Sequence, residues 1–137
     1  MRKNDDKIKK LLSEIEAKRK ALGSKPRAIW KTNGVLLGTN INTINSTAKC
    51  IELAAQFVWD KYRYIEACKF LELPAQNSEE KISFLNDALD DIKLRCQMVL
   101  WDIEKKKLEA MENRLKDLRS EDAKTEDALA DIEKSLV

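Results

Sequence analysis

The sequence predicts a mainly α-helical protein with a small antiparallel β-hairpin or three-stranded sheet, in the order α-β-β-(β)-α-α-α. Two observations support this fold class. The 137 residues include only three Gly and two Pro, too little turn-forming material for an all-β sandwich or barrel. Apolar residues recur every three or four positions along most of the chain, but this period changes between residues 27 and 44. The length fits one domain, residues 1–137, with long C-terminal helices of coiled-coil character.

The N-terminal element, residues 1–22, is predicted to be a basic helix. Asn4 can cap a helix that begins at the next residue, and the two aspartates that follow suit the positive end of the helix dipole. Gly23 fits the left-handed position after a helix, and Pro26 prevents the helix from continuing. The apolar face of this helix consists of Ile8, Leu11, Leu12, Ile15 and Leu22.

Residues 27–44 are predicted to form the small sheet. Arg27–Thr32 reads as a strand, Asn33–Gly34 has the sequence of a type I′ turn, and Val35–Leu37 follows as the return strand. Ile41–Ile44 is the expected short third strand. An isolated hairpin is only marginally stable in water, so one face of this sheet must be buried against a helix.

The helix predicted over residues 46–73 is the most apolar element of the chain. Asn45 or Ser46 can cap its start, and Pro74 ends it. Because apolar residues cover several of its faces, we expect it to be the central core helix, between the sheet and the last helices. Its recurring apolar positions are Ile51, Ala54, Ala55, Val58, Tyr62, Ile65 and Leu73.

Two further helices are predicted, a long one over residues 79–118 and an acidic one over residues 121–136. No Gly or Pro follows Pro74, and Ser120 before Glu121 looks like a new N-cap. A single helix over residues 79–118 is roughly 60 Å long at 1.5 Å per residue. That is more than the core can cover, so we expect part of this helix to project or to pair with another chain.

The formal net charge of +2 conceals an uneven distribution of charge. Residues 1–31 contain 11 Lys and Arg against 4 Asp and Glu, whereas residues 74–137 contain 11 against 16. The two ends of the chain can therefore attract each other, within one protomer or between neighbours. Alternatively, the basic end can face an external anion.

The sequence contains no histidine, so it lacks the usual general base and the commonest metal ligand. Adjacent carboxylates diverge by about 100° on a helix and do not converge on one ligand. We find no nucleophile–base pair, set of metal ligands, phosphate loop or dinucleotide motif. We therefore expect a non-enzymatic protein without a metal or cofactor.

The sequence predicts a cytoplasmic protein with no membrane partner. Residues 1–6 are too polar to contain the apolar core of a secretory signal, and the longest apolar stretches are a fraction of a membrane span. Cys50, Cys68 and Cys96 are odd in number and lie far apart in helical patterns. We expect them to be reduced core thiols.

One compact group of residues has the composition of an anion-binding site. Its basic, amide and aromatic side chains suit a phosphate and a stacked base, which predicts a nucleotide or nucleic-acid ligand. The alternative is that the tryptophan anchors the hairpin, the Asn-Gly pair serves the turn, and the basic residues solubilise an edge strand. The predicted ligand-binding residues are Lys25, Arg27, Trp30, Lys31 and Asn33.

This segment, K-P-R-x-x-W-K-T-N-G, resembles a segment of small bacterial and phage proteins that have a helical second half. The tail Leu118-Arg119-Ser120-Glu121 looks similar too. The resemblance implies no particular activity, but it favours a role for the segment beyond folding. The residues that match are Lys25, Pro26, Arg27, Trp30, Lys31, Thr32, Asn33 and Gly34.

Heptad-like apolar residues in the last helices predict an oligomer interface. The predicted function is therefore a protein-interaction or oligomerisation module that assembles through amphipathic helices, as a homo-oligomer or with a helical protein partner. The alternative function is an anion-binding adaptor, related to phages or to defence. The alternative for the interface is an intramolecular hairpin, in which the acidic tail folds back on the basic helix. The predicted interface residues are Leu108, Met111, Leu115, Leu118, Leu129 and Ile132.

Overall fold

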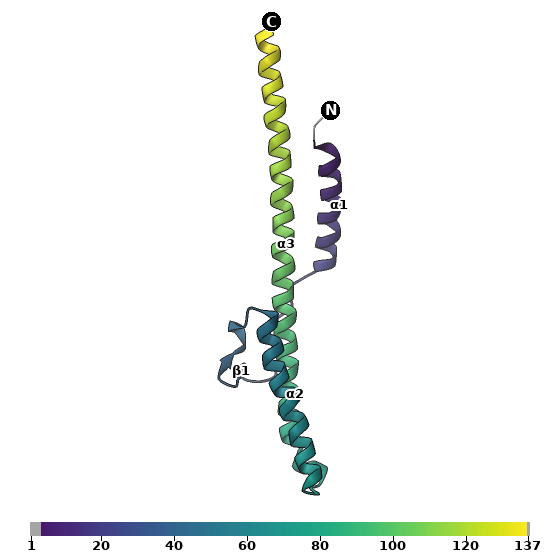
Figure 1. Ribbon diagram of the computed structural model, residues 1–137, viewed down its shortest axis with the longest axis vertical. Coiled ribbons are helices and arrows are strands. Elements are labelled where there is room, and N and C mark those ends of the chain that lie inside the picture. The colour runs from purple at the N-terminus through teal and green to yellow at the C-terminus, as the bar shows by residue number, and fades with distance from the viewer. Residues whose placement is uncertain (1–3, 137) are drawn as a thin grey trace. The chain divides into compact units, whose positions relative to one another are not determined.

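The structure is a computed structural model that describes residues 4–136, except for the side chains of residues 125–128, 130–131 and 133–136. Within this range the chain is mainly α-helical with one small two-stranded antiparallel sheet, which confirms the predicted fold class (Figure 1). No helix in this range combines the length and the apolar character needed to cross a membrane. The elements are α1 (Asp5–Leu22), β1 (Val35–Leu36), β2 (Thr39–Asn40), α2 (Thr47–Phe70) and α3 (Glu79–Leu136), with 3-10 turns at Ile41–Thr43 and Ala75–Asn77.

The first two helices begin and end near the predicted signals. Gly23 follows α1 with a φ of 61° and a ψ of −158°, a positive-φ conformation outside the left-handed helical region that glycine adopts without strain. Ser46 caps α2, because its Oγ accepts a hydrogen bond from the N–H of Lys49 at 3.2 Å. α2 ends at Phe70, ahead of Pro74.

The predicted first strand and turn of the hairpin are wrong. Residues 27–32 form no strand, and Asn33–Gly34 lies before β1 rather than between two strands. The turn between β1 and β2 is Leu37–Gly38, whose φ angles of 49° and 74° are both positive, as in a type I′ turn. In the resulting register, Val35 lies opposite Asn40. The sequence contains two turn-forming Gly sites in this segment, and the second one makes the hairpin.

Two further boundaries differ from the prediction. The expected third strand at residues 41–44 is replaced by the 3-10 turn Ile41–Thr43, which begins where the side chain of Asn40 accepts a hydrogen bond from the N–H of Asn42 at 3.0 Å. The expected break at Ser120 is absent, because α3 continues through it to Leu136. A serine can act as an N-cap, but it does not stop a helix. Proline removes a helical hydrogen bond and glycine has a low helix propensity, and neither residue follows position 74.

The chain divides into two compact units. Lys25–Asp102 forms one of them, which we call the hairpin unit. Met1–Ser24 and Ile103–Val137 form the other, which we call the two-helix unit. α3 contributes residues to both units.

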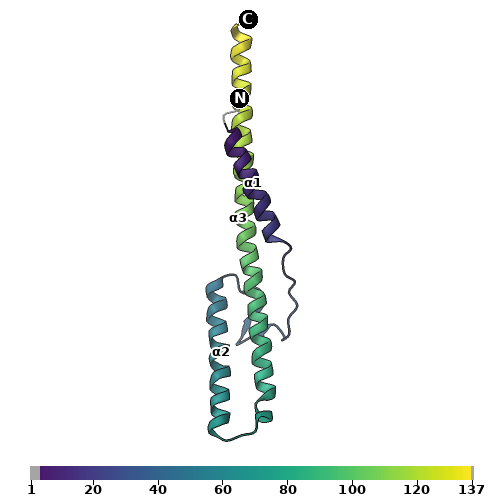
Figure 2. The same ribbon diagram turned by 90° about the vertical axis from the view of Figure 1, so that its right-hand side faces the viewer.

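In the hairpin unit, α2 and the first part of α3 lie side by side and antiparallel, and the β1–β2 hairpin packs against them (Figures 1 and 2). The guanidinium Nε of Arg95 on α3 donates a hydrogen bond to the carbonyl of Ile44 at 2.7 Å, which ties the segment before α2 to α3. All three parts contribute to one core, whose buried members are Leu36, Ile41, Ile44, Cys50, Leu53, Phe57, Leu85, Ala88 and Ile92.

In the two-helix unit, α1 packs along the C-terminal part of α3. Lys18 forms an ion pair with Glu104, and Arg19 forms one with Glu112 at 3.2 Å. At the other end of α1, the Asn4 amide donates to backbone and carboxylate oxygens of α3. The packing matches the alternative of an intramolecular hairpin. The apolar residues in contact are Ile8, Leu11, Ile15, Leu22, Leu108, Met111 and Leu115.

Candidate functional site

Residues 25–34 are bound to α3 through the carboxylate of Asp91, which is only 1% exposed. Asp91 Oδ1 accepts a hydrogen bond from the N–H of Lys31 at 2.8 Å. Its Oδ2 accepts hydrogen bonds from the N–H of Thr32 at 2.9 Å and from the Thr32 hydroxyl at 2.6 Å. A buried carboxylate is stable only with such partners. Because these two N–H groups bind Asp91, they do not pair with a neighbouring strand, which explains why residues 27–32 form no strand.

Two cations of the predicted ligand-binding group are paired with carboxylates of α3. The Lys31 ammonium lies 2.7 Å from Asp90 Oδ2, and this hydrogen bond raises the pKa of Lys31 and lowers the pKa of Asp90. The Lys25 ammonium lies 2.8 Å from Asp102 Oδ1 and 5.7 Å from the centroid of the Trp101 ring. Both ion pairs are exposed, so each contributes little to stability. A phosphate bound to either lysine would have to compete with these carboxylates.

The other predicted ligand-binding residues have structural contacts of their own or are exposed. Arg27 is exposed, whereas Trp30 is half-buried and packs against the core of the hairpin unit. Asn33 is exposed, and its side-chain oxygen accepts a hydrogen bond from the N–H of Val35 at 3.0 Å. Gly34 has a φ of 80°, and a Cβ placed on it would lie 3.4 Å from Trp30 Cδ1. These contacts favour the structural interpretation of the segment, and anion binding stays a prediction.

The environment of Cys50 does not favour a reactive thiol. Cys50, Cys68 and Cys96 are free thiols, and Cys50 is buried in the hairpin-unit core. Burial, followed by the neighbouring Cys96 thiol, raises the pKa of Cys50 to about 11. The Cys50 thiol is therefore protonated at neutral pH, and a protonated thiol is a poor nucleophile.

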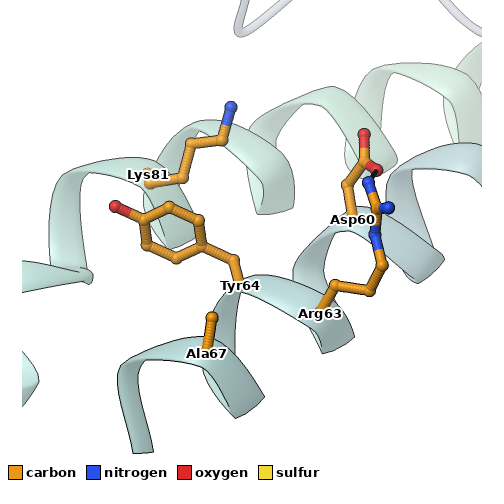
Figure 3. A pocket seen from close by; sticks show the side chains of 5 residues that line it. All are labelled: Asp60, Arg63, Tyr64, Ala67 and Lys81. Carbon is orange, nitrogen blue, oxygen red and sulfur yellow. Dashed lines mark hydrogen bonds and ion pairs between the residues drawn. The ribbon is translucent and has the colours of Figure 1, made fainter. Parts of the chain in front are cut away.

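The described residues contain no group of three or more His, Cys, Asp or Glu side chains that could hold a metal ion. An open pocket of about 410 Å³ lies between α2 and α3. Acidic, basic and phenolic side chains line it (Figure 3). Two of them, Asp60 and Arg63, form an ion pair with each other at 2.9 Å. We identify no nucleophile and base in hydrogen-bond contact there. The lining residues are Asp60, Arg63, Tyr64, Ala67 and Lys81.

The predicted oligomer-interface residues fall into two groups. Leu129 and Ile132 are each 55% exposed. The other four lie in the interior of the two-helix unit, where α1 already covers this part of α3. These buried or half-buried residues are Leu108, Met111, Leu115 and Leu118.

A separate regular apolar surface lies on α2. Ile51 is 67% exposed, and Val58 and Tyr62 are each 56% exposed. The expectation that these residues pack between two layers is wrong. The buried face of α2 is formed by Cys50, Leu53 and Phe57, and adjacent helical residues point about 100° apart, so the neighbouring positions face outward. We call the residues at this three- and four-residue spacing the α2 seam: Ala48, Ile51, Ala55, Val58, Tyr62 and Ile65.

Trp59 lies beside the α2 seam and widens it. Its ring stacks on that of Tyr62, with 5.7 Å between the centroids and 25° between the planes. On the Trp59 ring, the Arg63 guanidinium lies 5.9 Å from the centroid, and Arg63 is itself paired with Asp60. These contacts place both aromatic rings against neighbouring side chains on the exposed surface of α2.

Exposed charges of alternating sign follow the Trp59 side of the seam. We call Lys49, Glu52, Arg63 and Glu66 the rim residues. Lys49 lies 3.8 Å from Glu52, and Glu66 lies 3.4 Å from Lys69. An apolar seam with charged flanking positions is the pattern of a helix that pairs with another helix.

No protein-family model, curated protein or solved structure matches this chain. The resemblance of residues 25–34 to small bacterial and phage proteins therefore remains an expectation.

Proposed function

We propose that this protein is a non-enzymatic protein-interaction module that binds a helical partner through the α2 seam. The observation that supports the proposal is the exposure of Ile51, Val58 and Tyr62, together with Trp59, at heptad spacing on one helix. A partner helix laid along this face would insert its own apolar residues between those of the seam.

The α2 seam is not required for the core of its own unit. α2 already contributes Cys50, Leu53 and Phe57 to that core, and each of them is less than 5% exposed. Contiguous exposed apolar surface is uncommon on monomeric proteins and marks interaction sites. Trp and Tyr are also the residue types that most often dominate binding energy at protein interfaces.

The anion-binding alternative has less support from the geometry. Lys25 and Lys31 are each within 2.8 Å of a carboxylate, and the N–H groups of Lys31 and Thr32 bind Asp91. These nearby carboxylates would also repel a phosphate and so offset part of the attraction by the lysines. We therefore do not propose this segment as a nucleotide or nucleic-acid site.

Site-specific photo-crosslinking in the host cell tests the proposed function. We expect benzoylphenylalanine in place of Val58 to give, on irradiation, a covalent product larger than the 15.8 kDa chain. The same crosslinker at the exposed position Glu109 on α3 is the matched control. Equal yields from the two positions, or no product from position 58, would contradict an interaction surface on α2.

A further inference from the structure

We propose that the α2 seam binds a second copy of this chain in an antiparallel arrangement. This inference rests on the proposed function and names its partner. Two observations support it: the order of small and large residues along the seam, and the order of charges along the rim.

The order of small and large residues along the α2 seam is complementary to the same order read in the opposite direction. The apolar residues of a heptad occupy two positions, a and d. In an antiparallel helix pair, each layer of the interface places an a residue of one helix against a d residue of the other. Centring the pair between Ala55 and Val58 places Ala55 against the partner's Val58 and Ala48 against the partner's Ile65. Ile51 then lies against the partner's Tyr62. Most layers thus combine a small residue with a larger one, which allows close packing without voids.

The rim charges are complementary in nearly the same register. Lys49 comes to the level of the partner's Glu66, and Glu52 to the level of the partner's Arg63, within about half a helical turn. The two-fold axis of such a pair produces each contact twice. In a parallel pair, each rim residue would instead lie at the same height along the helix axis as the identical residue of the partner. Like charges would then lie at equal heights.

The available apolar area suits a modest dimer interface. Ile51, Val58, Trp59 and Tyr62 are each more than half exposed. With about 150–250 Å² for a fully buried aromatic residue and somewhat less for an aliphatic one, their exposed parts amount to on the order of 500 Å² per copy. Two copies would then bury roughly 1,000 Å², the lower limit for a specific interface, so we expect a reversible dimer that dissociates on dilution.

Charge reversal followed by mixing tests the antiparallel pairing. Glu52→Lys alone and Arg63→Glu alone each convert two attractions of the dimer into two repulsions. We expect each variant to dimerise about tenfold more weakly than the wild type at low salt. An equimolar mixture can form a dimer of one Glu52→Lys chain and one Arg63→Glu chain. In that dimer the new Lys at position 52 faces the new Glu at position 63, and the retained Arg63 faces the retained Glu52. Sedimentation velocity is expected to show dimers again in the mixture.

The matched control is Glu109→Lys, a reversal at an exposed position outside α2, which should leave dimerisation unchanged. Circular dichroism of each variant tests whether it retains its helices. Loss of the Arg63–Asp60 ion pair alone cannot produce recovery on mixing. If the wild type forms dimers but the mixed variants do not regain dimerisation, the antiparallel pairing is overturned and the proposed function is left intact. A purified monomer that still crosslinks from position 58 in cells would overturn the second copy as partner.

Discussion

Replacing Asp91 with Ala is expected to lower the free energy of unfolding by about 2–4 kcal/mol. Asp91 is 1% exposed and accepts three hydrogen bonds from Lys31 and Thr32. The substitution leaves two backbone N–H groups and one hydroxyl without their acceptor in a partly buried place. Urea denaturation followed by circular dichroism measures the loss.

The neighbouring carboxylate provides the control for this measurement. Asp90 is exposed and binds only the ammonium of Lys31, so Asp90→Ala is expected to cost less than about 1 kcal/mol. If the two alanine variants were equally stable, the contacts of Asp91 would not hold residues 25–34 in place.

Replacing Leu108 with Ala is expected to lower the free energy of unfolding by about 2–4 kcal/mol, because it leaves a cavity between α1 and α3. Leu108 is 1% exposed and packs with Ile15 in the core of the two-helix unit. The same change at Leu129, which is 55% exposed, is expected to cost less than about 0.5 kcal/mol. Denaturant titration of both variants measures the difference.

Protein concentration separates the two interpretations of Leu108. If α1 and α3 of the same chain bury Leu108, the decrease in the free energy of unfolding caused by Leu108→Ala is the same at low and high protein concentration. A loss that depended on concentration would instead indicate that Leu108 lies between chains, as the sequence alone suggested.

The helices were predictable because their signals are local. Gly23, Ser46 and Pro74 mark the end of α1 and the two limits of α2 wherever the rest of the chain lies. The hairpin was less predictable, because both Asn33–Gly34 and Leu37–Gly38 can form a tight turn. The choice between them depends on Asp91, which lies about 60 residues further along the chain and binds the backbone of the preceding segment.

The candidate site was harder to predict for a related reason. Heptad spacing shows that residues share one face of a helix, but it does not show what covers that face. The spacing of Leu108 and Leu115 and that of Ile51 and Val58 look alike in the sequence. Only the structure shows that α1 covers the first pair, while the second pair is exposed.

Sedimentation equilibrium of the wild type and of Val58→Glu tests the central claim most directly. Val58 is 56% exposed, so the substitution should leave the fold and its stability within about 0.5 kcal/mol of the wild type. We predict that the wild-type mass rises with concentration from 15.8 kDa toward twice that value, while Val58→Glu stays at 15.8 kDa. A wild type and a variant of equal mass at every concentration would contradict assembly through the α2 seam.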